Sequence, residues 1–86
     1  MTVEQLTIEP IHEYMGRRNT AMSCPVALAL QDKFPDKGVC VSSKRAWLFS
    51  DRQSTLVKLD EKLLSAIQMY DRGFPFELGT YTIEVY

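Results

Sequence analysis

The chain has 86 residues, of which 45% are hydrophobic and 24% are charged, a composition typical of one soluble globular domain spanning residues 1–86. Its formal net charge is −1, so overall electrostatics give no reason to expect bulk binding to nucleic acid or to an anionic membrane. The longest apolar run covers only residues 25–30, which is too short to span a membrane, and the first residues carry no signal sequence, so we expect a cytoplasmic protein.

The first predicted elements are a strand and a short helix. Residues 2–8 alternate loosely between apolar and polar side chains, which favours a strand. Pro10 can open a helix of one or two turns, and Gly16 can close it. A polar and basic connection, residues 17–23, follows.

The clearest helix of the chain follows, and both of its ends are marked. Pro25 lacks a backbone N–H and fits the first helical position, which makes Cys24 the expected N-cap. Pro35 prevents Phe34 from continuing the helix. The apolar side chains recur at helical spacing, so one stripe of this helix is expected to pack on a sheet. That stripe consists of Val26, Ala27, Leu30 and Phe34.

Three strands are predicted in the middle of the chain. Residues 39–43 and 46–50 are apolar and β-branched runs, and the short connection 43–45 favours a hairpin between them. A turn at 51–54 leads to a third strand at 55–59, which extends the same antiparallel meander.

A second long helix and a last strand complete the chain. Asp60 is a good N-cap, the apolar residues after it recur at the helical period, and Gly73 supplies a left-handed C-terminal cap. Residues 80–85 alternate as a strand, and the phase of the alternation changes at Gly79, where we predict a bulge or bend.

The order β-α-β-β-β-α-β predicts an α+β fold in two layers. We expect a largely antiparallel sheet of four to five strands, with both main helices packed on one face and a single shared core. So small a domain buries only about 60% of the surface that its unfolded chain exposes, so we also expect self-association into a homo-oligomer.

The start of the helix at Pro25 is the first candidate binding site. The N–H groups of a first helical turn have no partner within the helix, and the helix dipole attracts phosphate or carboxylate there. The connection before the helix adds hydrogen-bond donors, so the pattern predicts an anion site; alternatively, Ser23 simply caps the helix and the arginines are solvated. These candidate donors are Arg17, Arg18, Asn19, Thr20 and Ser23.

A second polar and basic cluster lies on the predicted hairpin, at Ser43, Lys44, Arg45 and Trp47. Lysine and arginine can contact a phosphate, and a tryptophan can stack on a base. Trp47 can equally belong to the core. If Leu48 points inward, Trp47 points outward and requires a partner.

Signals for catalysis or for a metal are weak. The helix dipole can activate the thiol of Cys24, but a structural cap or a small buried hydrophobe fits the position better, and both Cys24 and Cys40 are expected to be unpaired thiols. His12 is the one histidine, which excludes a histidine-based metal cluster, and we expect it to be a surface or cap residue rather than a general base. The chain contains none of the familiar catalytic motifs, so we predict a non-enzymatic protein without metal or cofactor.

Two stretches resemble a family of small bacteriophage proteins that have no agreed function. Residues 23–30 resemble the "CPxALAL" start of that family's helix. Residues 56–59, 69–73 and 74–78 resemble its strand, its helix end with an Asp–Gly-type stop, and its "PFxF" segment. This chain departs from the pattern at 79–86, where a further strand follows. The resemblance implies an accessory protein that a phage makes in the host cytoplasm, and it implies no catalytic residues.

Many phage accessory proteins of this size act against host defence, and two modes of action suit this sequence. In the first, the protein sequesters a small anionic, nucleotide-derived immune signal at the two basic clusters. In the second, it occludes a host defence protein through the aromatic hairpin or through an exposed edge of the last strand, residues 81–86. A third option, a thiol enzyme at Cys24, has less support.

Overall fold

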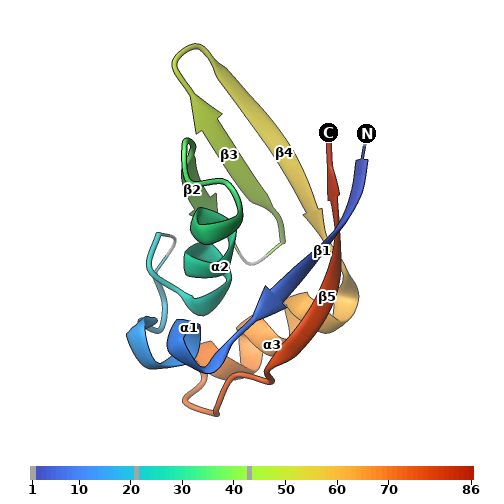
Figure 1. Cartoon of the computed structure of the whole chain (residues 1–86). Coiled ribbons are helices and arrows are strands. Elements are labelled where there is room, and N and C mark those ends of the chain that lie inside the picture. Colours follow the sequence, from blue (N-terminus) through green and yellow to red (C-terminus); the bar gives the residue numbers. More distant parts are fainter. Residues whose placement is uncertain (1, 21, 43) are drawn as a thin grey trace.

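The computed structural model describes residues 2–20, 22–42 and 44–86 (Figure 1). Five strands and three helices follow one another along the chain. In order they are β1 (Thr2–Ile8), α1 (Pro10–Met15), α2 (Pro25–Lys33), β2 (Gly38–Val41), β3 (Ala46–Ser50), β4 (Gln53–Leu59), α3 (Glu61–Asp71) and β5 (Gly79–Val85). Within the described ranges, none of these helices has both the length and the apolar character needed to cross a bilayer.

The five strands form one antiparallel sheet in the order β1-β5-β4-β3-β2, which confirms the predicted α+β class. The meander of β2, β3 and β4 is as predicted. β4 begins at Gln53 rather than Thr55, because the turn of its hairpin with β3 needs only two residues, Asp51 and Arg52. β5 pairs with β4 only over the last three residues of β4, 57–59, so the β3–β4 hairpin projects beyond the rest of the sheet (Figure 1).

The position of β5 corrects one expectation. This last strand was expected to offer an exposed edge, but it pairs with β1 along its whole length and with β4 along its final residues. The outer strands of the sheet are β1 and β2. Helix α2 packs against both of them, so the sheet curls around this helix (Figure 1).

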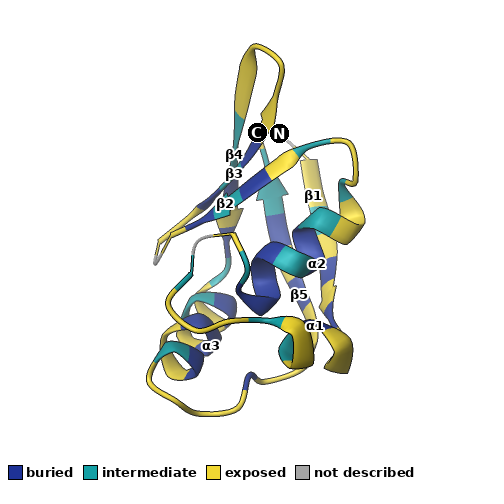
Figure 2. Cartoon of the chain, turned by 90° about the vertical axis from the view of Figure 1, so that its left-hand side faces the viewer, coloured by how far each residue is buried: buried dark blue, intermediate teal, exposed yellow. Residues whose placement is uncertain are grey.

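Alternation along the strands places one set of side chains in the core, as the burial colours of Figure 2 show. Helices α2 and α3 add their apolar stripes to the same core. No helix formed by the described residues covers the opposite face of the sheet. The strand residues that enter the core are Leu6, Ile8, Val39, Val41, Ala46, Leu48, Val57, Leu59, Tyr81 and Ile83.

The helix ends follow the local signals in the sequence. The Sγ atom of Cys24 accepts the N–H of Ala27 at 3.4 Å, so Cys24 is the N-cap of α2, as predicted. Asp60 caps α3 by accepting the N–H of Leu63 at 2.7 Å. Gly73 has a φ of +104° and ends α3 in the left-handed conformation that favours glycine.

Gly79 explains the change of phase before the last strand. It has a φ of +142° and is the first residue of β5, so residues 74–78 form an irregular segment rather than a strand. Phe76 from this segment is buried, with ring centroids 5.8 Å from Tyr70 and 6.4 Å from Tyr81 in edge-to-face geometry. The segment thus closes one end of the core.

Candidate functional site

The start of α2 is closed, which corrects the expectation of an open anion site there. Residues 24–27 are all buried, and the thiol of Cys24 already satisfies one N–H of the first turn. Burial raises the pKa of the Cys24 thiol above its ordinary value. This effect is larger than the lowering of the pKa by hydrogen bonds from the backbone. The structure therefore supports neither a solvent-accessible helix start nor an activated thiolate.

Arg18 binds the backbone at the C-terminus of α3. Its Nε donates to the backbone oxygen of Tyr70 at 2.7 Å, and Nη2 lies 3.4 Å and 3.3 Å from the backbone oxygens of Gly73 and Phe74. The guanidinium also lies 4.5 Å from the centroid of the Tyr70 ring. A helix C-terminus has unpaired carbonyls and partial negative charge, so it is a natural partner for an arginine.

The neighbours of Arg18 also form hydrogen bonds within the protein. Asn19 adopts a left-handed φ of +57° and donates its backbone N–H to Oδ1 of Asp71 at 2.8 Å. Thr20 donates its hydroxyl to the backbone oxygen of Arg17 at 2.8 Å, and the N–H of Arg17 binds the backbone oxygen of Ser23. The structure therefore does not bring the five candidate donors together around a common ligand site. These donors are Arg17, Arg18, Asn19, Thr20 and Ser23.

A hollow of about 280 Å³ lies beside this loop, and its charge is wrong for an anion. Asn19, Thr20 and Cys24 line one side of it. Among the described residues that line it, Asp71 carries the only charge, and that charge is negative. We therefore do not assign this hollow as the anion site.

The open face of the sheet holds the second predicted cluster. Leu48 is buried, so Trp47 and Phe49, its neighbours on β3, point to the face without helices. Trp47 lies opposite Cys40 of β2 and Leu56 of β4 and is half-buried there, while Phe49 is 45% exposed. The alternative interpretation of Trp47 as a core residue is therefore wrong.

A cationic hollow of about 250 Å³ lies on this face. Ser42 shapes the turn between β2 and β3, since its Oγ lies 3.3 Å from the backbone N of Lys44 and 3.1 Å from that of Arg45. The predicted Ser43 lies outside the described residues. We use the name cationic hollow for the site lined by Lys44, Arg45, Leu56, Lys58 and Tyr86.

Sequence reasoning found Lys44 and Arg45 but missed Lys58 and Tyr86. The chain end comes next to β4 because the N–H of Tyr86 donates to the backbone oxygen of Leu56 at 3.0 Å. The phenol of Tyr86 donates to Oε2 of Glu84 at 3.1 Å, and this hydrogen bond to a carboxylate raises the pKa of Tyr86. The alternation of residues 56–59 already indicates that Lys58 lies on the same face as Leu56. That Tyr86 lies beside them follows only from the pairing of β4 with β5.

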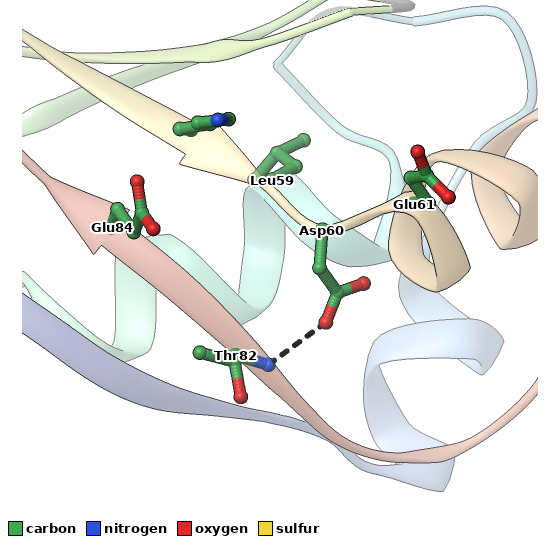
Figure 3. Close-up of a pocket in the computed structure, with 6 residues that line it drawn as sticks. Leu59, Asp60, Glu61, Thr82 and Glu84 are labelled. Atoms are coloured by element: carbon green, nitrogen blue, oxygen red, sulfur yellow. Dashed lines mark hydrogen bonds between the residues drawn. The ribbon is translucent and has the colours of Figure 1, made fainter.

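Figure 3 shows an acidic hollow of about 300 Å³. This hollow shares Lys58 with the cationic hollow. Asp60 uses both carboxylate oxygens within the fold, for the N–H of Leu63 and, at 3.2 Å, for that of Thr82. Figure 3 shows the carboxylates of Asp60, Glu61 and Glu84 spread along the hollow rather than converging. In the part of the chain that the structure describes, no cluster of three or more potential ligands for a metal ion occurs.

His12 is a buried residue that caps α1, not a surface residue. Its Nδ1 accepts the N–H of Glu9 at 2.9 Å, so the ring proton is on Nε2, which donates to Oδ2 of Asp32 at 2.7 Å. Both ring nitrogens are thus engaged, and the histidine joins α1 to α2.

No family model, no curated protein and no solved structure matches this chain. The resemblance to small phage proteins therefore stays a prediction, and the functional argument depends on the geometry of the site.

Proposed function

We propose that this protein is a non-enzymatic binding protein that captures a small anionic, nucleotide-like ligand in the cationic hollow. One observation carries the proposal: three cationic side chains from two separate segments, Lys44, Arg45 and Lys58, line the same hollow as Leu56 and Tyr86. The earlier candidate site at the start of α2 has no part in it.

The chemistry of the hollow suits a ligand with two different halves. Lysine and arginine form charge-assisted hydrogen bonds with phosphate oxygens, and arginine can do so with two bonds at once. The ring of Tyr86 and the apolar side chain of Leu56 offer a surface on which a base can stack.

The size of the hollow limits the ligand. Pockets that hold drug-sized molecules usually measure about 300–1,000 Å³. A hollow of about 250 Å³ therefore suits one phosphate and one base better than a dinucleotide. Because the whole chain has a net charge of −1, the attraction is local to this hollow and will weaken as salt is added.

The proposed biological role follows from the phage-like motifs. A phage accessory protein in the host cytoplasm that holds such a ligand without cleaving it would withdraw a nucleotide-derived signal from the host's immune response. The chemistry of binding does not need a nucleophile, and the buried thiol of Cys24 and the fully engaged His12 agree with a binding role.

A two-part ligand gives a direct test. Calorimetry would compare cyclic AMP with its separate parts, inorganic phosphate and adenosine. We expect a complete nucleotide to bind at least about tenfold more tightly than either half, because both halves of the site then contribute. Equal affinity for phosphate and the nucleotide would contradict the proposed stacking surface.

A second candidate function is occlusion of a host defence protein by the same open face. The exposed side chain of Phe49, outside the cationic hollow, favours it. A Phe49→Ser variant separates the two functions: it should retain nucleotide binding but lose a protein partner that docks on the aromatic surface.

A further inference from the structure

We propose that a second site, the groove between β1 and α2, binds an extended basic peptide segment of a partner protein by strand addition. Among the described residues, none lines both this groove and the cationic hollow, so the inference does not depend on the proposed ligand.

The first argument is the edge of β1. This strand is an outer strand of the sheet and pairs with β5 in an unbroken register from Thr2 to Ile8. In an antiparallel pair, alternate residues direct their N–H and C=O groups away from the partner strand. The strand contains neither proline nor lysine, two residues that commonly protect such edges against pairing.

The second argument is a groove of about 290 Å³ along this edge. Residues 5–7 form one wall, and Ala29, Asp32 and Lys33 of α2 form the other. β5 pairs with one edge of β1, and α2 packs against the same strand. Ala29 is buried in the core, so the accessible part of the α2 wall, against which an added strand would pack its side chains, is formed by Asp32 and Lys33.

The third argument is charge. The positive charge of Lys33 is matched by Glu4, with Nζ 3.4 Å from Oε1. The Asp32 side chain is 72% exposed, and Glu9 is also exposed in the wall of the groove. The local excess of charge is therefore negative and complements a basic peptide.

A hydrogen bond from His12 orients the carboxylate of Asp32, which would bind a basic side chain of the peptide. The Nε2–H of His12 holds Oδ2 of Asp32 at 2.7 Å, which orients the carboxylate while Oδ1 can accept from a lysine or arginine of the peptide. Since α1 and α2 are joined by this bond, the wall of the groove is set before a peptide arrives.

The test uses a blocked octapeptide of alternating lysine and valine, titrated into the whole protein and followed by amide chemical shifts. We expect saturable binding, with shifts and slowed hydrogen exchange along residues 3–8. A peptide with N-methyl groups on alternate amides should bind at least about tenfold more weakly, because it has lost donors for the strand edge. A peptide of alternating glutamate and valine should also bind at least about tenfold more weakly.

Asp32→Asn supplies the matched variant, because the asparagine oxygen still accepts from His12. We expect a loss of lysine-peptide affinity of about threefold to tenfold, while the control Asp51→Asn, the same change at the far hairpin, leaves affinity unchanged. Thermal unfolding would show that both variants fold. The proposal is overturned if the lysine peptide does not bind up to about 1 mM, or if it binds with shifts around Lys58 instead. Affinity that survives N-methylation would overturn it equally.

Discussion

Arg18 and Tyr70 are joined twice, by a hydrogen bond from the guanidinium to the Tyr70 backbone oxygen at 2.7 Å and by the approach of the guanidinium to the ring at 4.5 Å. Tyr70 in turn donates its hydroxyl to the backbone oxygen of Gly16 at 3.0 Å. The loop before α2 is therefore fastened to the end of α3 from both directions. The guanidinium of Arg18 is engaged in these contacts within the fold, so it is not available as an anion site.

We predict that Arg18→Ala lowers the free energy of unfolding by about 1–2 kcal/mol, because three backbone oxygens and one aromatic ring lose a cationic partner. Urea unfolding measures this value. Arg17→Ala is the matched control, since Arg17 is exposed beside it, and we expect a change within about 0.5 kcal/mol. Equal losses in the two variants would show that the contacts of Arg18 do not stabilise the loop.

Gly16 ends α1, as predicted, but the structure requires a glycine there because of close packing and not because of its backbone conformation. Its φ is −74°, so this residue does not need the freedom of glycine in φ. A Cβ atom built on it would lie 2.8 Å from the backbone oxygen of His12 and from two ring atoms of Pro25. We expect Gly16→Ala to destabilise the fold by about 1–3 kcal/mol through overpacking, measured by urea unfolding. Gly38→Ala is the control, because its nearest contact would be an ordinary 3.6 Å.

How far the sequence predicts this protein depends on the separation of the interacting residues. The caps at Cys24, Asp60 and Gly73 and the strand meander follow from local residue patterns, and these predictions are confirmed. The partners of Arg18 lie more than fifty positions away, and β1 pairs with the other end of the chain. No local pattern encodes such pairings.

The cationic hollow also combines residues that a local pattern predicts with residues that only the tertiary structure brings together. The hairpin residues Lys44 and Arg45 lie in a short basic segment and were predicted. Lys58 and Tyr86 join them only after β4 and β5 pair, so their roles depend on tertiary structure. Self-association is a prediction that native mass spectrometry of the purified protein would test.

We predict that the two cysteines differ in reactivity. Cys24 is buried and burial raises its thiol pKa, whereas Cys40 is half-buried on the open face. Iodoacetamide at neutral pH should therefore modify Cys40 first, and mass spectrometry of the digested protein would locate the adduct. Modification of both thiols at the same rate would contradict the closed start of α2.

The raised pKa of Cys24 also predicts loss of stability at alkaline pH. As the pH rises through 9.0, the ordinary value, the thiol ionises in the unfolded chain before it does so in the native protein. The native state then binds more protons than the unfolded state, so the free energy of unfolding falls with rising pH. Urea unfolding between pH 7.5 and about 9.5 should show a smaller fall in Cys24→Ser than in the control Cys40→Ser. Equal falls would mean that Cys24 is not the group responsible.

The measurement that most directly tests the account is calorimetric titration of cyclic AMP into the native protein, Lys58→Gln and Lys62→Gln. Both variants lose one positive charge, but only Lys58 lines the cationic hollow, whereas Lys62 is exposed on α3. We predict that Lys58→Gln weakens binding about tenfold while Lys62→Gln binds as the native protein does. Equal weakening in both variants, or no binding to the native protein up to about 1 mM, would contradict the proposed site.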